Sequence, residues 1–295
     1  MSRRVALVTC REFGDLDEDD RLLIPELAAL GIEAEPAVWD DPAVDWNGYD
    51  LAVVRSTWDY VDRRDEFLTW AATVPRLANS ASTIAWNTDK RYLRDLGDDG
   101  VPVVQTAWLG SGDDAELPAS GVVIIKPAVG AGSRDAGRFD LAGPDRELAD
   151  KHVRRLLDRG ETVMVQPYLD AVESAGETAM LFAGGRFSHA IRKEALLHGP
   201  DVAVRALFRP EAISPRTPAA AELEVAEQVL ASLRSLATEP PLYARVDVLP
   251  GPDGRPVLLE LELAEPSLFL RHGTGAAARF AAAIGTRLDR VLNTR

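Results

Sequence analysis

The sequence predicts an α/β protein in which a doubly wound N-terminal domain precedes two α+β lobes. Three observations lead to this fold class. The N-terminal part alternates short apolar runs with helical patterns, which is the βαβ rhythm of a parallel sheet. The middle part combines short strands with a long helical pattern, and the remainder is dominated by two hairpins. We place the domains at residues 1–88, 89–165 and 166–295.

The predicted N-terminal domain consists of apolar strands separated by helices. Residues 5–8, 32–38 and 51–54 are short runs suited to buried parallel strands. Residues 17–30 and 62–74 place apolar side chains at helical spacing. Ligands of doubly wound sheets bind at the carboxyl ends of the strands, which draws attention to the residues after position 54.

The polar and aromatic segment that follows the third strand is a candidate substrate site. Its position at the carboxyl end of a predicted strand favours ligand binding. A packed loop explains the same residues equally well, and the sequence does not decide between the two interpretations. The candidate substrate residues are Arg55, Trp58, Asp59 and Tyr60, together with Ser267 from the C-terminal lobe.

The two remaining lobes are expected to mix strands and helices. Thr88 is a suitable N-cap for a helix that ends near residue 96. The further expected elements are strands at 122–125 and 162–165, a helix at 144–159, hairpins of 178–182 with 187–192 and of 242–249 with 257–263, a helix at 223–236 and an alanine-rich C-terminal helix.

Composition excludes several classes of protein. The formal net charge of −14 repels phosphate backbones, so nucleic acid is not an expected partner. No apolar run approaches the ~20 residues of a membrane helix, and the N-terminus lacks a signal-peptide core. Cys10 is the only cysteine, which excludes an internal disulfide. We therefore expect a cytoplasmic enzyme that does not bind membranes, and its oligomeric state, a homo-oligomer included, stays open.

Three carboxylates and one guanidinium group are predicted to share a face of the last hairpin. Side chains alternate along a strand, so Glu260 and Glu262 point to one side, as do Arg245 and Asp247 on the other strand. Carboxylate oxygens are the ligands that Mg²⁺ prefers, with water and phosphates completing the shell. The alternative is a solvated sheet face with cross-strand ion pairs. Crowded acids favour the metal site, because they repel each other unless a cation is present.

Lys126 ends a predicted strand and precedes a glycine-rich loop. Glycine lets backbone N–H groups approach a polyphosphate closely, and Gly132 and Ser133 lie at the centre of this loop. The pattern matches neither a Walker A motif nor a dinucleotide fingerprint. Taken alone, it favours an ordinary surface loop.

A third motif begins where the strand at 162–165 ends. The residues Gln166, Pro167, Tyr168 and Leu169 form an exposed extended segment whose main chain could meet an adenine edge. Glu177, farther along the chain, could contact a ribose. Without context, this motif is simply a strand and a turn.

Taken in order, these motifs resemble the ATP-grasp superfamily, which includes D-alanine–D-alanine ligase, glutathione synthetase and the ribosomal-protein glutamate ligases. The resemblance covers residues 85–270 and implies that ATP phosphates are held by Lys90 and Lys126. It also implies that Arg245 lies near the transferred phosphate. The remaining cation would be Lys193 or Arg205, and the sequence does not choose between them.

The resemblance also assigns the nucleotide and metal contacts. The adenine-binding linker corresponds to the segment from Gln166, which stands where many members have glutamate, and the ribose acid to Glu177. The magnesium ligands correspond to Asp247 and to Glu260, which in the family bridges two ions. Glu262 takes the place of the usual asparagine, which adds a charge and keeps an oxygen ligand.

Residues 55–60 and 262–269 are similar to a small bacterial subgroup that includes the cyclo-ligase forming D-cycloserine from O-ureido-D-serine. The implied activity is ATP- and Mg²⁺-dependent activation of a small amino acid-like carboxylate as an acyl phosphate. An amine-type nucleophile then attacks it, within the same molecule in the case of a cyclo-ligase. The alternatives are a non-catalytic nucleotide-binding regulatory protein and an ATP-grasp carboxylase or kinase.

Overall fold

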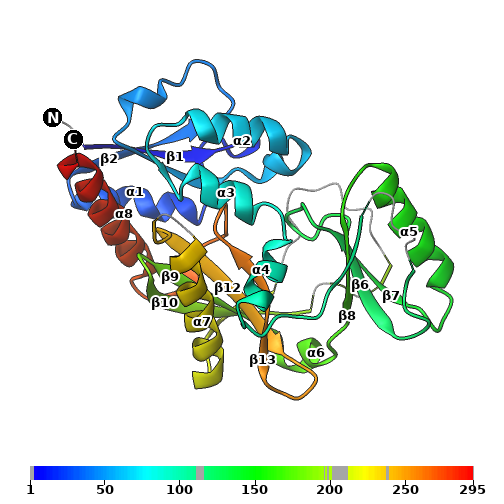
Figure 1. Cartoon of the computed structure of the whole chain (residues 1–295). Coiled ribbons are helices and arrows are strands. Elements are labelled where there is room, and N and C mark those ends of the chain that lie inside the picture. Colours follow the sequence, from blue (N-terminus) through cyan, green and yellow to red (C-terminus); the bar gives the residue numbers. More distant parts are fainter. Residues whose placement is uncertain are drawn as a thin grey trace.

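Three sheets form the framework of the protein (Figure 1), seen here in a computed structural model that describes residues 3–110, 116–195, 197, 199–200, 212–236 and 239–294. The N-terminal sheet is parallel, with strand order β2-β1-β3-β4. The central sheet has the order β5-β8-β6-β7, and the C-terminal sheet has the order β11-β10-β9-β12-β13; both are antiparallel. The predicted fold class is therefore confirmed.

The N-terminal sheet is covered by helices on both faces because its strands are apolar on both sides. Leu7 and Val53 pack toward α1 and α8, while Val8 and Val54 pack toward Phe67 of α2. The elements are β1 (Arg3–Thr9), α1 (Leu23–Ala29), β2 (Ile32–Val38), β3 (Leu51–Ser56), α2 (Arg64–Thr73), β4 (Leu77–Ala78), α3 (Ala81–Asn87) and, from the other end of the chain, α8 (Ala276–Asn293).

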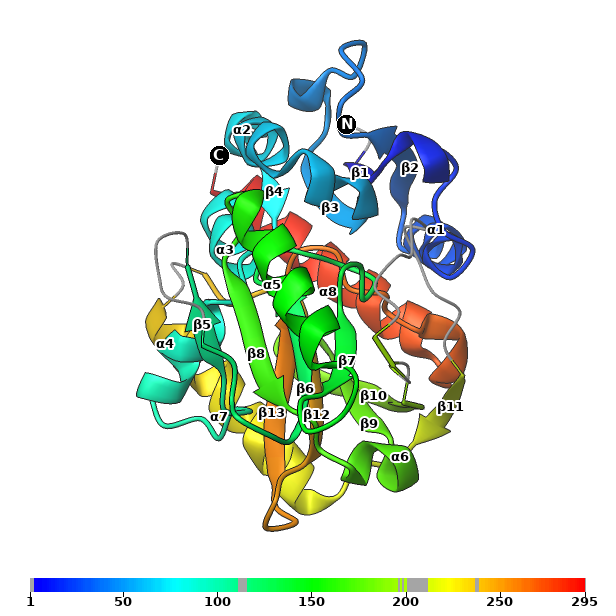
Figure 2. The ribbon, with the colours of Figure 1, turned by 90° about the vertical axis from the view of Figure 1, so that its right-hand side faces the viewer.

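The central sheet carries one long helix on its outer face, seen in front of the strands in Figure 2. Ala149, Val153 and Leu156 of this helix are buried against Ile125 and Phe139 of the sheet. The elements are β5 (Ala107–Leu109), β6 (Val122–Pro127), β7 (Gly137–Asp140), α5 (Arg146–Asp158) and β8 (Val163–Pro167).

The C-terminal sheet uses its two faces differently. One face packs on α4 and α7 through side chains such as Met180, Val246 and Leu261. On the opposite face, Leu181 and Tyr243 pack into the core that contains α8, whereas Lys193, Glu260 and Glu262 of this sheet line a cavity. The elements are α4 (Tyr92–Asp98), α6 (Ala171–Ala175), β9 (Glu177–Ala183), β10 (Arg186–Lys193), β11 (Ile213–Arg216), α7 (Ala220–Leu236), β12 (Tyr243–Pro250) and β13 (Pro256–Glu262).

The buried amide of Asn87 at the end of α3 fastens the C-terminal sheet to the N-terminal part of the chain. Its Nδ2 donates to the carbonyl oxygen of Leu261 at 2.8 Å, and its Oδ1 accepts from the N–H groups of Leu263 and Ala264 at 2.6 and 3.2 Å. These backbone groups lie at the end of β13, where the strand edge would otherwise leave them unpaired. The position of the β13 end is thus set by a side chain distant in sequence.

The expected helix starting at Thr88 is wrong. Helix α3 ends at Asn87, Thr88 caps its C-terminal end, and α4 begins only at Tyr92. The break has a tertiary cause, because the N–H of Lys90 donates to the carbonyl oxygen of Ala128 in the central lobe. This contact holds the backbone of Lys90 against the loop that follows β6.

Helix α8 returns from the C-terminal part of the chain to pack on α1, as Figure 1 shows. The boundaries 1–88, 89–165 and 166–295 therefore remain a proposal, in which the last segment contributes to the core of the first. Among the described helices, none combines the length and the apolar character that crossing a bilayer requires.

Candidate active site

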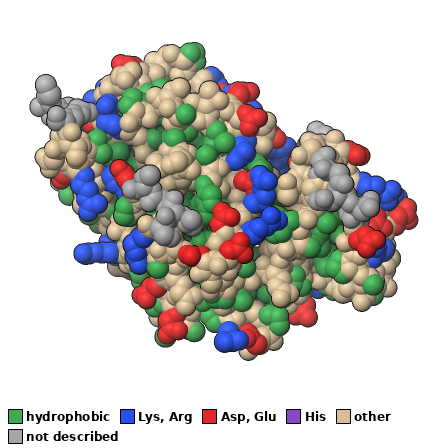
Figure 3. Space-filling model, in the orientation of Figure 1, with side chains coloured by type: hydrophobic (Ala, Val, Ile, Leu, Met, Phe, Trp, Pro, Cys, Tyr) green, Lys and Arg blue, Asp and Glu red, His purple; other side chains and the backbone are tan. Residues whose placement is uncertain are grey.

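One cavity lies between the central and C-terminal sheets, with the loop after β3 at one end. Figure 3 shows basic and acidic side chains meeting in the groove beside the central lobe. The predicted residues that line the cavity are Trp58, Tyr60, Lys90, Lys126, Gly132, Ser133, Gln166, Pro167, Tyr168, Leu169, Glu177, Lys193, Arg245, Glu260, Glu262 and Ser267. Motifs from all three predicted domains thus converge on a single site.

Two lysines approach the cavity from the central side. Lys90 Nζ donates to the carbonyl oxygen of Gly130 at 2.5 Å and lies 3.1 Å from Glu260 Oε1. Lys126 ends β6, and in the described structure it forms no ion pair. Burial, aided by the positive charge of Lys90, lowers the pKa of Lys126, although Glu260 acts in the opposite direction. The free ammonium group is thus placed to meet an anion.

The glycine-rich loop after β6 reaches across the cavity. Gly132 and Ser133 have positive φ angles of 60° and 57°, which turn the chain sharply. Arg134 Nη1 lies 2.6 Å from Asp62 Oδ2 in the N-terminal domain. The loop is thereby connected to the other side of the groove.

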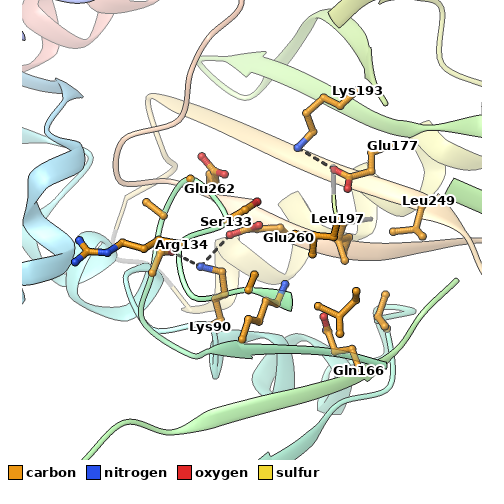
Figure 4. Close-up of a pocket in the computed structure, with 18 of the residues that line it drawn as sticks. Lys90, Ser133, Arg134, Gln166, Glu177, Lys193, Leu197, Leu249, Glu260 and Glu262 are labelled. Carbon is orange, nitrogen blue, oxygen red and sulfur yellow. Dashed lines mark hydrogen bonds and ion pairs between the residues drawn. The ribbon is translucent and has the colours of Figure 1, made fainter. Parts of the chain in front are cut away.

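Asp247, Glu260 and Glu262 lie on one face of the β12–β13 hairpin, as the strand alternation predicts. Asp247 is paired with Glu260, and Arg245 with Glu262, in the register of the two strands. Figure 4 shows Glu260 and Glu262 turned into the cavity beside Lys90. The two strands therefore deliver carboxylates and a guanidinium group to the same place.

Each of these carboxylates has a cationic neighbour. Asp247, which is fully buried, lies 2.7 Å from Lys193 Nζ and 2.9 Å from Arg245 Nε. Arg245 also pairs with Glu262. Lys193 bridges to Glu177 at 2.9 Å, a contact drawn in Figure 4. The cross-strand ion pairs that the sequence left as an alternative are thus present in this structure.

The pKa values of the two β13 glutamates move in opposite directions. Burial opposes ionisation of Glu260, but the ammonium groups of Lys90 and Lys126 outweigh it and lower the pKa of Glu260 to about 2. Burial raises the pKa of Glu262 to about 8, although Arg245 favours its ionised form. The negative charges of Glu260 and Asp247 add to the rise. A divalent cation would relieve this repulsion.

The donor set suits Mg²⁺ only in company with phosphates. Among the described residues, no group of three acidic, histidine or cysteine side chains is arranged to hold a metal ion alone. Mg²⁺ is commonly held by one or two carboxylates with substrate phosphates and water as further ligands. Glu260, with Asp247 or Glu262, offers such a partial shell.

The far end of the cavity is apolar and suits a flat aromatic ring. Val104, Leu249 and Leu259 line it, beside the Gln166–Leu169 segment. The Gln166 side chain is buried and donates to Thr106 Oγ1 at 2.9 Å, and the Tyr168 N–H donates to Val122. An adenine edge would therefore have to use other backbone groups of this segment.

The candidate substrate residues separate into two groups. Trp58, Tyr60 and Ser267 line the cavity, whereas Arg55 and Asp59 are not among its lining residues. The guanidinium group of Arg55 is buried, with its Cζ 4.4 Å from the centre of the Tyr243 ring and its Nη1 3.6 Å from Asp20 Oδ1. Asp59 accepts a hydrogen bond from Trp39 Nε1 at 3.0 Å. Arg205 lies outside the described residues, so the choice between it and Lys193 stays open, and Lys193 lies beside Asp247 together with Arg245.

Sequence reasoning missed Glu265. This residue lines the cavity and is only 8% exposed. Burial raises the pKa of its carboxyl group to about 7, although Lys90 acts against the rise. The signal available in the sequence was its position in a loop directly after the β13 acids, between Glu262 and Ser267.

The chain is similar to known proteins along nearly its whole length. Residues 5–79 match the family model described as the N-terminal domain of D-cycloserine synthetase DcsG. Cycloserine biosynthesis protein DcsG from Streptomyces lavendulae is 37% identical over 305 residues, covering 96% of this chain and 98% of that protein. A crystal structure of D-cycloserine synthetase DcsG superposes with a TM-score of 0.86 at 36% identity, covering 97% and 99% of the two chains.

More distant structures share the fold. A D-alanine–D-alanine ligase from Bacillus anthracis superposes with a TM-score of 0.65 at 14% identity, covering 99% of each chain. The high identity to DcsG over nearly the whole length shows the family directly. The chain therefore belongs to the DcsG family of ATP-dependent ATP-grasp ligases.

Proposed function

We propose that this ligase uses ATP and Mg²⁺ to convert the carboxylate of a small amino acid-like substrate into an acyl phosphate, which a nitrogen of the same molecule attacks. The observation that carries the proposal is that Lys90, Lys126, Lys193 and Arg245 line one cavity together with Glu260 and Glu262 of β13. The buried Asp247 does not line the cavity itself and contacts it through Lys193 and Arg245. Cations and carboxylates so arranged suit a polyphosphate and its metal ions.

In the first step, a substrate carboxylate oxygen attacks the γ-phosphorus and ADP leaves. Lys90 and Lys126 would hold phosphate oxygens, and Arg245 would lie beside the transferred group and stabilise its equatorial charge. Asp247, Glu260 and Glu262 would hold Mg²⁺, two ions in our proposal, which neutralise charge on the phosphates. Lys193, 2.7 Å from the buried Asp247, would hold that side chain in position.

In the second step, a nitrogen attacks the acyl carbon and inorganic phosphate leaves. The DcsG relatives are called D-cycloserine synthetase, and our candidate substrate is accordingly O-ureido-D-serine. Its oxygen-bonded nitrogen would close the five-membered ring on the acyl carbon. Hydrolysis of the carbamoyl group to carbon dioxide and ammonia would then leave the ring N–H of D-cycloserine.

An acyl phosphate must be kept from water, and the loop after β6 is placed to do so. It spans the cavity, and Arg134 joins it to Asp62 on the N-terminal domain. Trp58 and Tyr60, from the segment after β3, line the cavity on the side of the N-terminal domain. Closure of this loop over ATP would enclose the reacting carboxylate.

The deciding experiment measures phosphate release from ATP and Mg²⁺ by purified protein against a panel of small amino acids that includes O-ureido-D-serine. We expect O-ureido-D-serine to trigger release, with ADP and D-cycloserine as products identified by mass spectrometry. Release with a different acid would retain the ligase and change the substrate.

Other outcomes would indicate a different activity. A stable phosphorylated product would indicate a kinase, and dependence on bicarbonate would indicate a carboxylase. Tight binding of ATP without release by any panel member would favour a regulatory nucleotide-binding role. No ATP binding in a calorimetric titration would contradict the proposed function.

A further inference from the structure

Glu265 occupies the part of the cavity that faces the N-terminal domain. Its backbone oxygen accepts a hydrogen bond from Trp58 Nε1 at 3.1 Å, and the Tyr60 hydroxyl acts to lower the pKa of its carboxyl group. The carbonyl oxygen of Pro266, the next residue, accepts from the buried Arg55 Nη1 at 3.5 Å. Arg55 at the end of β3 and Trp58 after it therefore hold the Glu265 loop in place from one side.

Glu265 differs from its acidic neighbours in charge pairing. The other acidic side chains of the described cavity lining each have a cationic partner, namely Lys193 for Glu177, Arg192 for Glu194, Lys90 for Glu260 and Arg245 for Glu262. Glu265 has no cation within ion-pair distance in the described structure, although it is 92% buried, being 8% exposed. A buried carboxylate without a cationic partner is costly unless a ligand supplies one.

We propose that the Glu265 carboxylate, whose backbone is held by Trp58, binds the ammonium group of the substrate and so selects α-amino acids. This inference rests on the proposed function, because it assumes that a carboxylate substrate occupies the same cavity. The substrate carboxylate must lie next to the phosphate-binding cations. An α-ammonium group is attached to the neighbouring carbon, so its counter-charge must lie close to that cluster.

The electrostatics of the site agree with this placement. Lys90 and Glu260 both act on the pKa of Glu265, which places it beside the cluster that receives the phosphates. Trp58 and Ser267 line the same end and leave the ammonium group no other described acidic partner that lacks a cation. The ligand class follows as a zwitterion, with its carboxylate toward Lys126 and Arg245 and its ammonium group toward Glu265.

The test removes the carboxylate from the protein and the ammonium group from the substrate, separately and together. We would measure kcat/KM for ATP-dependent phosphate release with O-ureido-D-serine and with 3-(ureidooxy)propanoic acid, which lacks the amino group. For the wild type, we expect the analogue to be roughly 10- to 100-fold poorer, the range of one charge-assisted hydrogen bond. For Glu265→Gln, we expect that preference to fall to less than about threefold.

Two further variants separate recognition from a structural effect. Glu265→Asp keeps the charge and should retain part of the preference for the zwitterion. Glu147→Gln removes a carboxyl group on α5 that lies outside the cavity lining, is paired with Lys151 and has a side-chain exposure of 78%, and it should leave the preference unchanged. An equal loss by Glu265→Gln with both substrates would overturn the inference, as would a wild type that does not distinguish them.

Failure of the proposed function would be visible separately. If the wild type turns over neither compound, calorimetric titration of both onto the ADP-loaded protein decides the inference. Tighter binding of the zwitterion by the wild type, lost in Glu265→Gln, would retain the inference without the reaction. Equal binding, or no binding of either compound, would overturn it.

Discussion

Lys90 Nζ lies 3.1 Å from Glu260 Oε1 and joins the turn before α4 to strand β13. The same ammonium group donates to Gly130 in the loop after β6. One lysine thus connects the proposed phosphate loop with the proposed metal ligand. The pair explains why the pKa of Glu260 is low although burial acts against ionisation.

Replacing Glu260 tests the metal assignment. We expect Glu260→Gln to lower kcat at least about 100-fold, because it removes a charged ligand at the transferred phosphate while keeping the shape of the side chain. Single-turnover phosphate release measures this, with Glu147→Gln, at an exposed position on α5, as the matched control. A kcat within about threefold of the wild type would remove Glu260 from the metal site.

Two lysine substitutions should have contrasting effects. Lys126→Met removes a half-buried cation that pairs with no described carboxylate, so ATP affinity should fall about 10- to 100-fold with little loss of stability. Lys193→Met leaves the buried Asp247 and its neighbour Glu177 short of a cation and should cost about 2 kcal/mol or more of unfolding free energy. Calorimetric ATP titration and urea unfolding measure the two effects. Equal stability of the two variants would contradict this account.

Asn87 should matter for stability although it carries no charge. Asn87→Ala would leave the buried backbone groups of Leu261 and Leu263 without their hydrogen-bond partner. We therefore expect a loss of about 3 kcal/mol in unfolding free energy. Asn47→Ala, at an exposed asparagine, should change it by less than about 0.5 kcal/mol. Urea denaturation of both variants checks the difference, and a small effect of Asn87→Ala would show that water replaces the amide.

Asp20 should make stability depend on pH. Burial raises the pKa of Asp20 to about 6, although Arg55 and Ser56 act in the opposite direction. The folded state therefore holds this proton more tightly than the unfolded chain, whose value is 3.8. The contribution of Asp20 to wild-type stability is largest below that value and is lost as the pH rises through about 6.

The variant Asp20→Asn cannot titrate at this position. Its stability relative to the wild type should rise by up to about 3 kcal/mol between pH 4 and 7, as the linkage between pKa and folding requires. Urea unfolding across this pH range measures the difference. Asp15→Asn, at an exposed position, should follow the wild type. Parallel curves for Asp20→Asn and the wild type would show that Asp20 keeps an ordinary pKa.

The hairpin carboxylates could be placed on one face from sequence because alternation along a strand is a local rule. In the observed register, Asp247 of β12 lies directly opposite Glu260 of β13, which confirms that placement. The prediction of a helix that starts at Thr88 was wrong because a contact distant in sequence, and not a local rule, decides the backbone there. A hydrogen bond from Lys90 to Ala128, far along the chain, interrupts the helical backbone there.

The candidate substrate residues also depend partly on local sequence and partly on contacts with distant residues. Arg55 and Asp59 follow a parallel strand, which made them candidates, yet Arg55 is turned into the core against Tyr243. Glu265 was not singled out because a lone acid in a loop carries no periodic signal. Glu265 is a candidate because it is buried, because the Tyr60 hydroxyl acts on its carboxyl group, and because it has no described cationic partner. All three properties depend on distant parts of the chain.

The amino-acid sequence by itself determined the alternation of strands and helices, the two C-terminal hairpins and the residue types of the proposed nucleotide site. These follow from side-chain periodicity and turn chemistry, which act over a few neighbouring residues. Only the tertiary structure decided which charges meet: Lys90 with Glu260, Lys193 with Asp247, and Glu265 with no cation of the described part of the chain. Such pairings depend on packing between separate sheets. The pKa of each charged group depends on its burial, which no local sequence pattern specifies.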